Sequence, residues 1–158
     1  MMKYFTFFEL EFSKSAFDAK IKNQPTAENE QNLAALVAAV LDPLREAYGK
    51  PITVSSGFRN TKVNTYIHGA NDSQHKKGEA ADICIPKKPA ENYKLAQLIV
   101  KLGNYDQLIL EDVKSAADYS QPQWVHVSWK RSGLNRHQIL IKLKGQNKYI
   151  VLNPSDLK

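Results

Sequence analysis

The chain has 158 residues with ordinary hydrophobic and charged fractions, which fits one domain with a single core. No apolar run approaches the roughly 18 residues that a membrane helix needs, and the single cysteine excludes an internal disulfide. The net charge of +6 favours an anionic partner, either nucleic acid or a polyanionic cell wall, unless it is only a solvated basic face. Glu9 and Glu11 interrupt the N-terminal apolar stretch too early for a signal peptide, so we expect synthesis in the cytoplasm.

The N-terminal third of the chain predicts helices. Residues 5–18 predict a short helix or turn that packs onto the domain. Between Thr26 and Gly49, apolar side chains recur at three- and four-residue steps, which gives one apolar helix face. Thr26 fits the N-cap, Gly49 fits the C-terminal end, and Pro43 should kink the helix. The side chains expected to anchor the first segment are Phe5, Phe8, Leu10 and Phe12.

The rest of the chain alternates predicted strands with two further helices, at residues 60–68 and 91–102. This order predicts an α+β fold, an antiparallel sheet with helices packed mainly on one face. We expect a single domain over residues 1–158, with a core at about 4–130 and a basic C-terminal hairpin at 131–158. The expected strands are 52–55, 80–85, 106–111, 124–129, 138–143 and 148–152.

Two segments carry candidate metal ligands. His75 follows a polar loop, and Asp82 lies farther along in a predicted apolar strand, where a charge is costly unless it is paired or bound to metal. His126 lies in the run Trp124–Trp129, and strand alternation turns it away from the core. Two imidazoles and one carboxylate suit a catalytic Zn²⁺, which takes three protein ligands and leaves the fourth position open. A structural salt bridge at Asp82 and a hydrogen-bonded structural His126 are the alternatives.

These segments resemble a known family. Ser-Gln-His-Lys-Lys-Gly-Glu-Ala-Ala-Asp at residues 73–82 resembles the S-x-H-x-x-G-x-A-x-D signature of the zinc D-Ala-D-Ala carboxypeptidase family. Ser-Ser-Gly-Phe-Arg at 55–59 resembles the S-G-[YF]-R segment that precedes this signature. Residues 105–111 and Trp-Val-His-Val-Ser at 124–128 resemble the closing strands of small single-domain members, which are often found in phages and bacterial genomes. The similarity covers roughly residues 4–130.

The resemblance implies a fold of the type shared by these peptidases and the zinc domain of hedgehog proteins. It also implies that Arg59 grips an anionic part of the substrate, such as a peptide carboxylate, or the scissile carbonyl. The fork of guanidinium donors suits that task, although a surface ion pair is the alternative for Arg59. Ser73 and Gln74 either bind the substrate backbone or stabilise their own loop. The residues implied as ligands of Zn²⁺ are His75, Asp82 and His126.

The catalytic base is where the chain departs from the family pattern. Many relatives have a carboxylate three residues before the last histidine ligand, but here that position is Gln123, which does not accept a proton at working pH. If the strands at 106–111 and 124–129 form a hairpin, Glu111 lies opposite Trp124 and shares the face of His126. We therefore expect Glu111 to act as the base. The weaker candidates are Asp112 and Asp118.

The working hypothesis is a zinc-dependent peptidase that hydrolyses peptidoglycan stem peptides, either as a D-Ala-D-Ala carboxypeptidase or as an endopeptidase. The alternative, motivated by Gln123, is a catalytically impaired zinc-containing module that binds the cell wall or a peptide. Binding of nucleic acid through the basic C-terminus is disfavoured because no nucleic-acid motif is evident. We expect a monomer without a membrane span that reaches the cell wall by another export route or after lysis.

Overall fold

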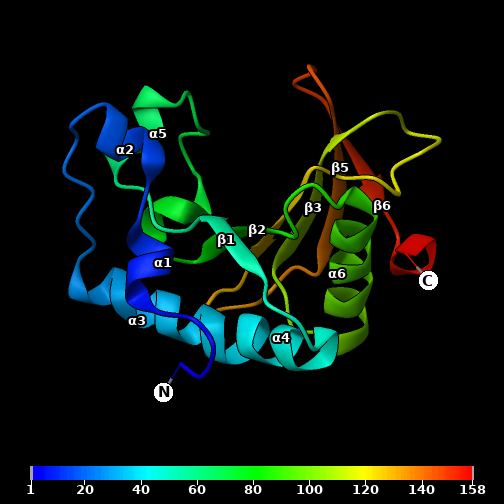
Figure 1. Ribbon diagram of the computed structural model, residues 1–158, viewed down its shortest axis with the longest axis horizontal. Helices are drawn as coiled ribbons and strands as arrows, with labels where there is room; N and C mark the ends of the chain where they lie inside the picture. The colour runs from blue at the N-terminus through cyan, green and yellow to red at the C-terminus, as the bar shows by residue number, and fades with distance from the viewer. Residues whose placement is uncertain (1, 158) are drawn as a thin grey trace.

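The computed structural model describes residues 2–157, whose six strands form one mixed sheet (Figure 1). The strand order is β1-β2-β4-β3-β5-β6, and each neighbouring pair is antiparallel except β3 and β5. The predicted α+β fold is confirmed, with this one parallel pair as its departure from a purely antiparallel sheet. The strands are β1 (Thr53–Ser56), β2 (Ala80–Cys84), β3 (Gln107–Val113), β4 (Trp124–Ser128), β5 (Gln138–Leu143) and β6 (Tyr149–Leu152).

The parallel pair follows from the path of the chain after β4. Ser128, at the end of β4, lies opposite Gln107, at the start of β3. The loop at 129–137 then returns to that same end of the sheet, where the backbone N–H of Gln138 donates to the Asp106 carbonyl. Because β3 and β5 start at the same end, they run in the same direction. The final hairpin of β5 and β6 is antiparallel, as expected.

A single long helical segment runs along the base of the molecule (Figure 1). It comprises α3 (Ala27–Leu36), a π-helical turn η1 (Val37–Leu41) and α4 (Asp42–Tyr48). The Thr26 side chain caps its start, and Gly49 ends it with φ +77°. Pro43 was expected to kink this helix. The π-helical turn η1 ends at Leu41, shortly before Pro43, and this wider turn accommodates a residue that lacks an N–H and crowds the preceding turn.

The N-terminal segment forms two short helices, α1 (Phe7–Glu11) and α2 (Lys14–Asp18). Thr6 and Glu9 form a reciprocal capping box at the start of α1. Phe5 and Leu10 are buried, as predicted. The prediction that Phe8 and Phe12 also pack onto the domain is wrong, because both rings are exposed and stack on each other instead. A helix of five residues has room for one buried face only, which Leu10 occupies.

The other helices lie close to their predicted positions. Asn60 caps α5 (Thr61–Tyr66), and α6 (Pro89–Leu102) begins two residues before the expected start and ends at Gly103. Two short 3₁₀ helices complete the fold, η2 (Gln74–Lys77) and η3 (Pro154–Leu157). Among residues 2–157, no helix combines the length and the apolar character that crossing a membrane requires.

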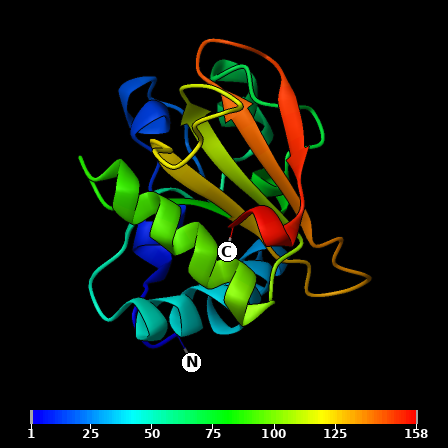
Figure 2. The same ribbon diagram turned by 90° about the vertical axis from the view of Figure 1, so that its right-hand side faces the viewer.

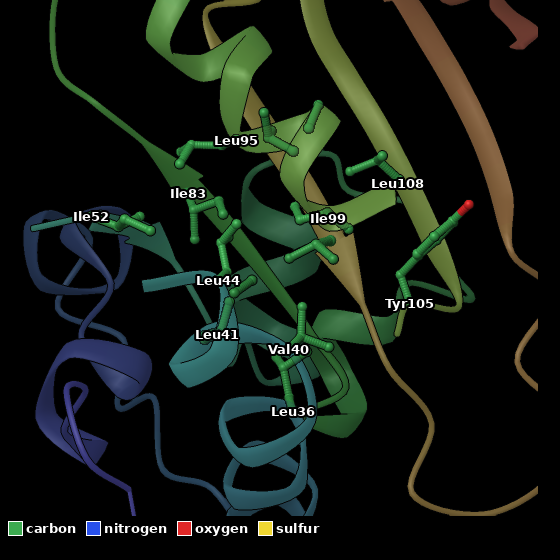
Figure 3. Close-up of a cluster of buried hydrophobic side chains, with 14 of the residues drawn as sticks. Leu36, Val40, Leu41, Leu44, Ile52, Ile83, Leu95, Ile99, Tyr105 and Leu108 are labelled. Carbon is green, nitrogen blue, oxygen red and sulfur yellow. The ribbon is translucent and has the colours of Figure 1, made fainter. Parts of the chain in front are cut away.

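The core lies between one face of the sheet and the helices α3, α4 and α6. Figure 2 shows α6 crossing that face, and Figure 3 shows how side chains from the long helix, α6 and the strands meet there. Full burial of one such aliphatic side chain stabilises the fold by about 1.5–3 kcal/mol. The opposite face of the sheet is therefore left for polar and functional side chains. Labelled members of the core are Leu36, Val40, Leu41, Leu44, Ile52, Ile83, Leu95, Ile99, Tyr105 and Leu108.

Candidate metal centre and groove

The face of the sheet that turns away from the core helices forms the floor of a groove with a volume of about 820 Å³. Strands β2, β3, β4, β5 and β6 contribute to it, and the segment at 67–75 forms one of its walls. The seven residues that the sequence assigns to the metal site, to the base and to substrate binding all line this groove. Those seven lining residues are Arg59, Ser73, Gln74, His75, Asp82, Glu111 and His126.

Three of these side chains converge on one point. Asp82 on β2 lies directly opposite His126 on β4, and η2 brings His75 over the pair. The His75 Nε2 is 3.2 Å from the His126 Nδ1 and 3.3 Å from the Asp82 Oδ1. The His126 Nδ1 is 3.0 Å from the same Asp82 oxygen. Two imidazole nitrogens and one carboxylate oxygen within this distance form a donor set that could hold a metal ion.

A backbone carbonyl sets the protonation of His75. The His75 Nδ1 lies 2.6 Å from the carbonyl oxygen of Gly57, so this nitrogen carries the hydrogen and donates it. The Nε2 lone pair then faces the cluster, which is the tautomer that a metal ligand needs. Gly57 must be glycine at this place, since a Cβ would lie 2.1 Å from the carbonyl oxygen of Leu10. The Ser-Ser-Gly-Phe-Arg segment therefore supports the cluster through its backbone.

The long helix holds the other side of the His75 turn. The Asn32 side chain on α3 donates to the carbonyl of Lys77 at 2.9 Å. Gly78 follows with φ +72°, and a Cβ there would approach the carbonyl oxygen of Asn29 to 2.4 Å. Both the left-handed backbone and the close approach require glycine. This packing explains physically why the motif has a glycine three residues after His75.

Asp82 is ionised in this setting. Burial alone would raise the pKa of its carboxyl, but His75 and His126 outweigh burial and lower that pKa below its usual range. Arg59 adds a positive group, with its Nη1 3.9 Å from the Asp82 Oδ2. Burial lowers the pKa of Arg59, yet a guanidinium stays charged in proteins. Arg59 therefore faces the groove as a cation beside the cluster, although its Nε is buried without a hydrogen-bond partner among the described residues.

Glu111 lies one strand away from the cluster, in the predicted register. Glu111 is opposite Trp124, and Ile109 is opposite His126, so both face the groove. Glu111 as a whole residue is 8% exposed, and within residues 2–157 nothing hydrogen-bonds its Oε2. Burial raises the pKa of Glu111, while Lys142 on β5, with its Nζ 3.8 Å from that oxygen, acts in the opposite direction. A carboxylate with a free buried oxygen on the groove side is suited to accept a proton.

Ser73 and Gln74 both line the groove beside η2. Gln74 accepts a hydrogen bond from the Arg136 Nη2 at 3.1 Å, and Arg136 also grips the buried carboxylate of Asp106. Burial alone would raise the pKa of Asp106, but the hydrogen bonds from Arg136 prevail and hold that pKa at about 2. The loop after β4 is thereby tied to the wall of the groove.

Gln123 and the other two histidines are not members of the cluster. Gln123 is exposed and does not line the groove. Among the four histidines, His68 is exposed at the groove wall and His137 is exposed against Tyr105. The sequence interpretation did not single out Lys142 or Arg136 as parts of the groove. Alternation along β5 could have placed Lys142 on the groove face, but its closeness to Glu111 depends on the parallel pairing of β3 with β5.

Three converging donors on the floor of an open groove are typical of metal-dependent hydrolases. The sequence pattern described as Peptidase M15 matches residues 3–128, so the chain belongs to that family of zinc peptidases. The chain is also similar to a protein of Streptomyces albus G named "Zinc D-Ala-D-Ala carboxypeptidase", at 36% identity over 67 residues. That alignment covers 37% of this chain and 26% of the relative. The predicted family and the predicted zinc cofactor are confirmed, and the β5–β6 hairpin lies beyond the matched residues.

Proposed function

We propose that this zinc peptidase hydrolyses peptidoglycan stem peptides, either as a D-Ala-D-Ala carboxypeptidase or as an endopeptidase. The observation that carries the proposal is the convergence of His75, Asp82 and His126 on the floor of a groove of about 820 Å³. The printed name of the Streptomyces relative supports the substrate class. On this proposal the protein acts at the cell wall.

The residues present fit a zinc ion. Their two nitrogens and one oxygen are the ligand types that zinc prefers, and three ligands leave a coordination position open. His75 and His126 would bind through Nε2 and Nδ1, and Asp82 through Oδ1. When bound, zinc supplies a Lewis acid that polarises the scissile carbonyl and acidifies water. The hydrogen bond from His75 to the Gly57 carbonyl keeps that ligand in the right tautomer.

Glu111 is proposed as the general base. It accepts a proton from the attacking water and passes it to the leaving amine. Its position on β3 compensates for Gln123, which stands where many relatives have a carboxylate. The ammonium of Lys142 helps to keep Glu111 ionised despite its burial. The base thereby comes from a neighbouring strand and approaches the scissile bond from the sheet floor.

Arg59, Ser73 and Gln74 are proposed to bind the substrate. Arg59 presents a charged fork to a peptide carboxylate or to the oxygen of the scissile carbonyl, where negative charge develops. Gln74 is held in place by Arg136, so its amide meets the peptide backbone in a defined orientation. Ser73 lies beside it on the same wall and offers a hydroxyl.

A second candidate function is a zinc-containing module that binds wall peptides without cleaving them. Gln123 favours it, because the carboxylate expected at that position is missing.

The two functions predict different fates for the same purified substrate. Zinc-loaded protein is incubated with defined stem peptides, and products are separated by mass. Release of an amine and a carboxylate fragment, lost after chelation and restored by zinc, supports the peptidase. Binding of the peptides without any release supports the binding module.

A further inference from the structure

One row of side chains crosses the groove floor from the metal cluster to the C-terminal hairpin. Each member lies directly opposite the next in the strand pairing. Since neighbouring strands are about 4.8 Å apart, the row extends about 14 Å beyond His126. The members, in order across the sheet, are Asp82, His126, Ile109, Leu140 and Val151.

The chemistry of this row changes where it leaves the cluster. Asp82 and His126 are polar, whereas Ile109, Leu140 and Val151 are apolar. Polar side chains border the apolar part on both sides. On one side the Gln107 amide donates to the Gln138 side chain at 2.6 Å. On the other side Lys142 pairs with Tyr149, in direct opposition across β5 and β6. An apolar strip with polar margins is what an extended peptide needs, because its side chains and its backbone require different partners.

The exposure of the hairpin residues is unusual for a structural role. Val151 is 69% exposed and Tyr149 is 46% exposed, and both line the groove. Their neighbours Ile150 and Leu152 point the other way and pack against the core. Packing against the core therefore accounts for the apolar side chains of Ile150 and Leu152, but not for those of Tyr149 and Val151. Exposed apolar side chains that continue a binding groove indicate a surface that is covered when ligand binds.

We propose that the β5–β6 hairpin is the distal floor of the substrate groove and binds an apolar side chain of an extended oligopeptide. An extended peptide advances about 3.3 Å per residue, so a span of about 14 Å places that side chain about four residues from the bond at the cluster. The inference rests on the proposed peptidase function and sharpens it. Substrates with several residues on one side of the cleaved bond are preferred over dipeptides.

The test uses peptides with one common cleavage site and a distal residue, four positions away, that is either leucine or glycine. Affinity is measured by calorimetry on the full zinc-loaded chain carrying Glu111→Gln, and KM is measured on the chain without that change. We expect the distal leucine to tighten binding and lower KM by roughly fivefold, as partial burial of one aliphatic side chain predicts. A dipeptide with the same cleavage site should bind more weakly than either peptide.

Two substitutions on the hairpin have matched controls elsewhere on the surface. Val151→Ser and Tyr149→Ala should each reduce the preference for leucine over glycine. Leu134→Ser, at a residue that is 89% exposed, and Tyr66→Ala, at one that is 55% exposed, lie outside the groove and should keep the full preference. Equal affinity for the two peptides, or the same preference in the hairpin variants, would overturn the inference. Suppose that the leucine peptide binds more tightly in calorimetry, but the chain without Glu111→Gln cleaves neither peptide. This result would support the distal floor and reject the peptidase function.

Discussion

At its two ends, the groove is built in opposite ways. At the β2–β4 end, His75, Asp82 and His126 are largely buried and are fixed by hydrogen bonds to each other and to the Gly57 carbonyl. At the β5–β6 end, Tyr149 and Val151 stand open to solvent on an edge strand. Chemistry needs groups that are held in place before the substrate arrives, whereas distal binding needs only an apolar surface of the right shape.

The contrast between the two ends of the groove also coincides with the end of the region that the Peptidase M15 pattern matches. The buried end belongs to residues 3–128, which the Peptidase M15 pattern matches, and the exposed end follows after them. A buried polar cluster tolerates little change, because loss of one partner leaves another charge unpaired. An exposed edge strand tolerates substitution at little cost to stability. On the proposal that the hairpin binds substrate, it is the part of the groove in which substrate preference can vary without damage to the reaction.

Removal of a cluster side chain is expected to have the largest effect. His75→Ala deletes one of the three proposed ligands, so zinc affinity should fall by more than about 100-fold, the upper range for loss of a supporting partner alone. Zinc content by elemental analysis after dialysis measures this, and peptide hydrolysis should disappear with it. His68→Ala is the matched control, because its exposed ring lies on the groove wall away from the cluster. Full zinc content in His75→Ala would refute the ligand assignment.

Loss of the proposed base should come next. Glu111→Gln keeps the size of the side chain but removes the proton acceptor, so kcat should fall by about 10²–10⁴-fold while zinc content stays unchanged. Gln123→Ala, at an exposed residue outside the groove, should leave kcat as it is. Steady-state kinetics on a defined stem peptide distinguish the two variants. An unchanged kcat in Glu111→Gln would move the base to another residue.

The two faces of the sheet should differ in stability. Leu108 is fully buried on the core face of β3, so Leu108→Ala should destabilise the protein by about 2–5 kcal/mol through lost burial and a cavity. Val151→Ser on the open end of the groove should change stability by no more than about 0.5 kcal/mol. Urea denaturation followed by circular dichroism measures both. A large loss of stability in Val151→Ser would show that the hairpin end is structural.

A smaller effect than that of Leu108→Ala is expected from Asp106, as an acid-dependent loss of stability. Its pKa is about 2 in the fold, against an ordinary value of 3.8, because the hydrogen bonds from Arg136 outweigh burial. A lowered pKa means that the contribution is present above about pH 4 and is lost as pH falls toward about 2. The loss should be about 1–2 kcal/mol.

Denaturation curves between pH 5 and 2 are compared for the natural chain and Arg136→Met, with pH values chosen to bracket the two pKa values of Asp106. The variant lacks the stabilising partner, so it should start less stable and lose less stability on acidification. Asp118→Asn, at an exposed loop residue, is the control and should follow the natural curve. An identical pH dependence in Arg136→Met would rule out the pair as its origin.

Much of the groove could be predicted from local sequence signals. Alternation along the run 124–128 correctly separated Val125 and Val127, which are buried in the core, from His126 on the groove face. The predicted pairing of Glu111 with Trp124 is confirmed, since the intervening loop and strand alternation together define a hairpin register. Phe8 and Phe12 were placed wrongly because apolar character alone does not tell which side of a very short helix is covered.

The roles proposed for Arg59, Ser73 and Gln74 and the extent of the domain stay predictions. By itself, the sequence determined the types of the candidate ligands and the strands that carry Asp82, His126 and Glu111, because these depend on neighbours along the chain. Only the tertiary structure decided that β5 runs parallel to β3 and brings Lys142 to Glu111 and Val151 into line with the cluster. That choice depends on where the loop at 129–137 crosses the end of the sheet, and Arg136 anchors this crossing to Asp106 across about thirty residues of chain.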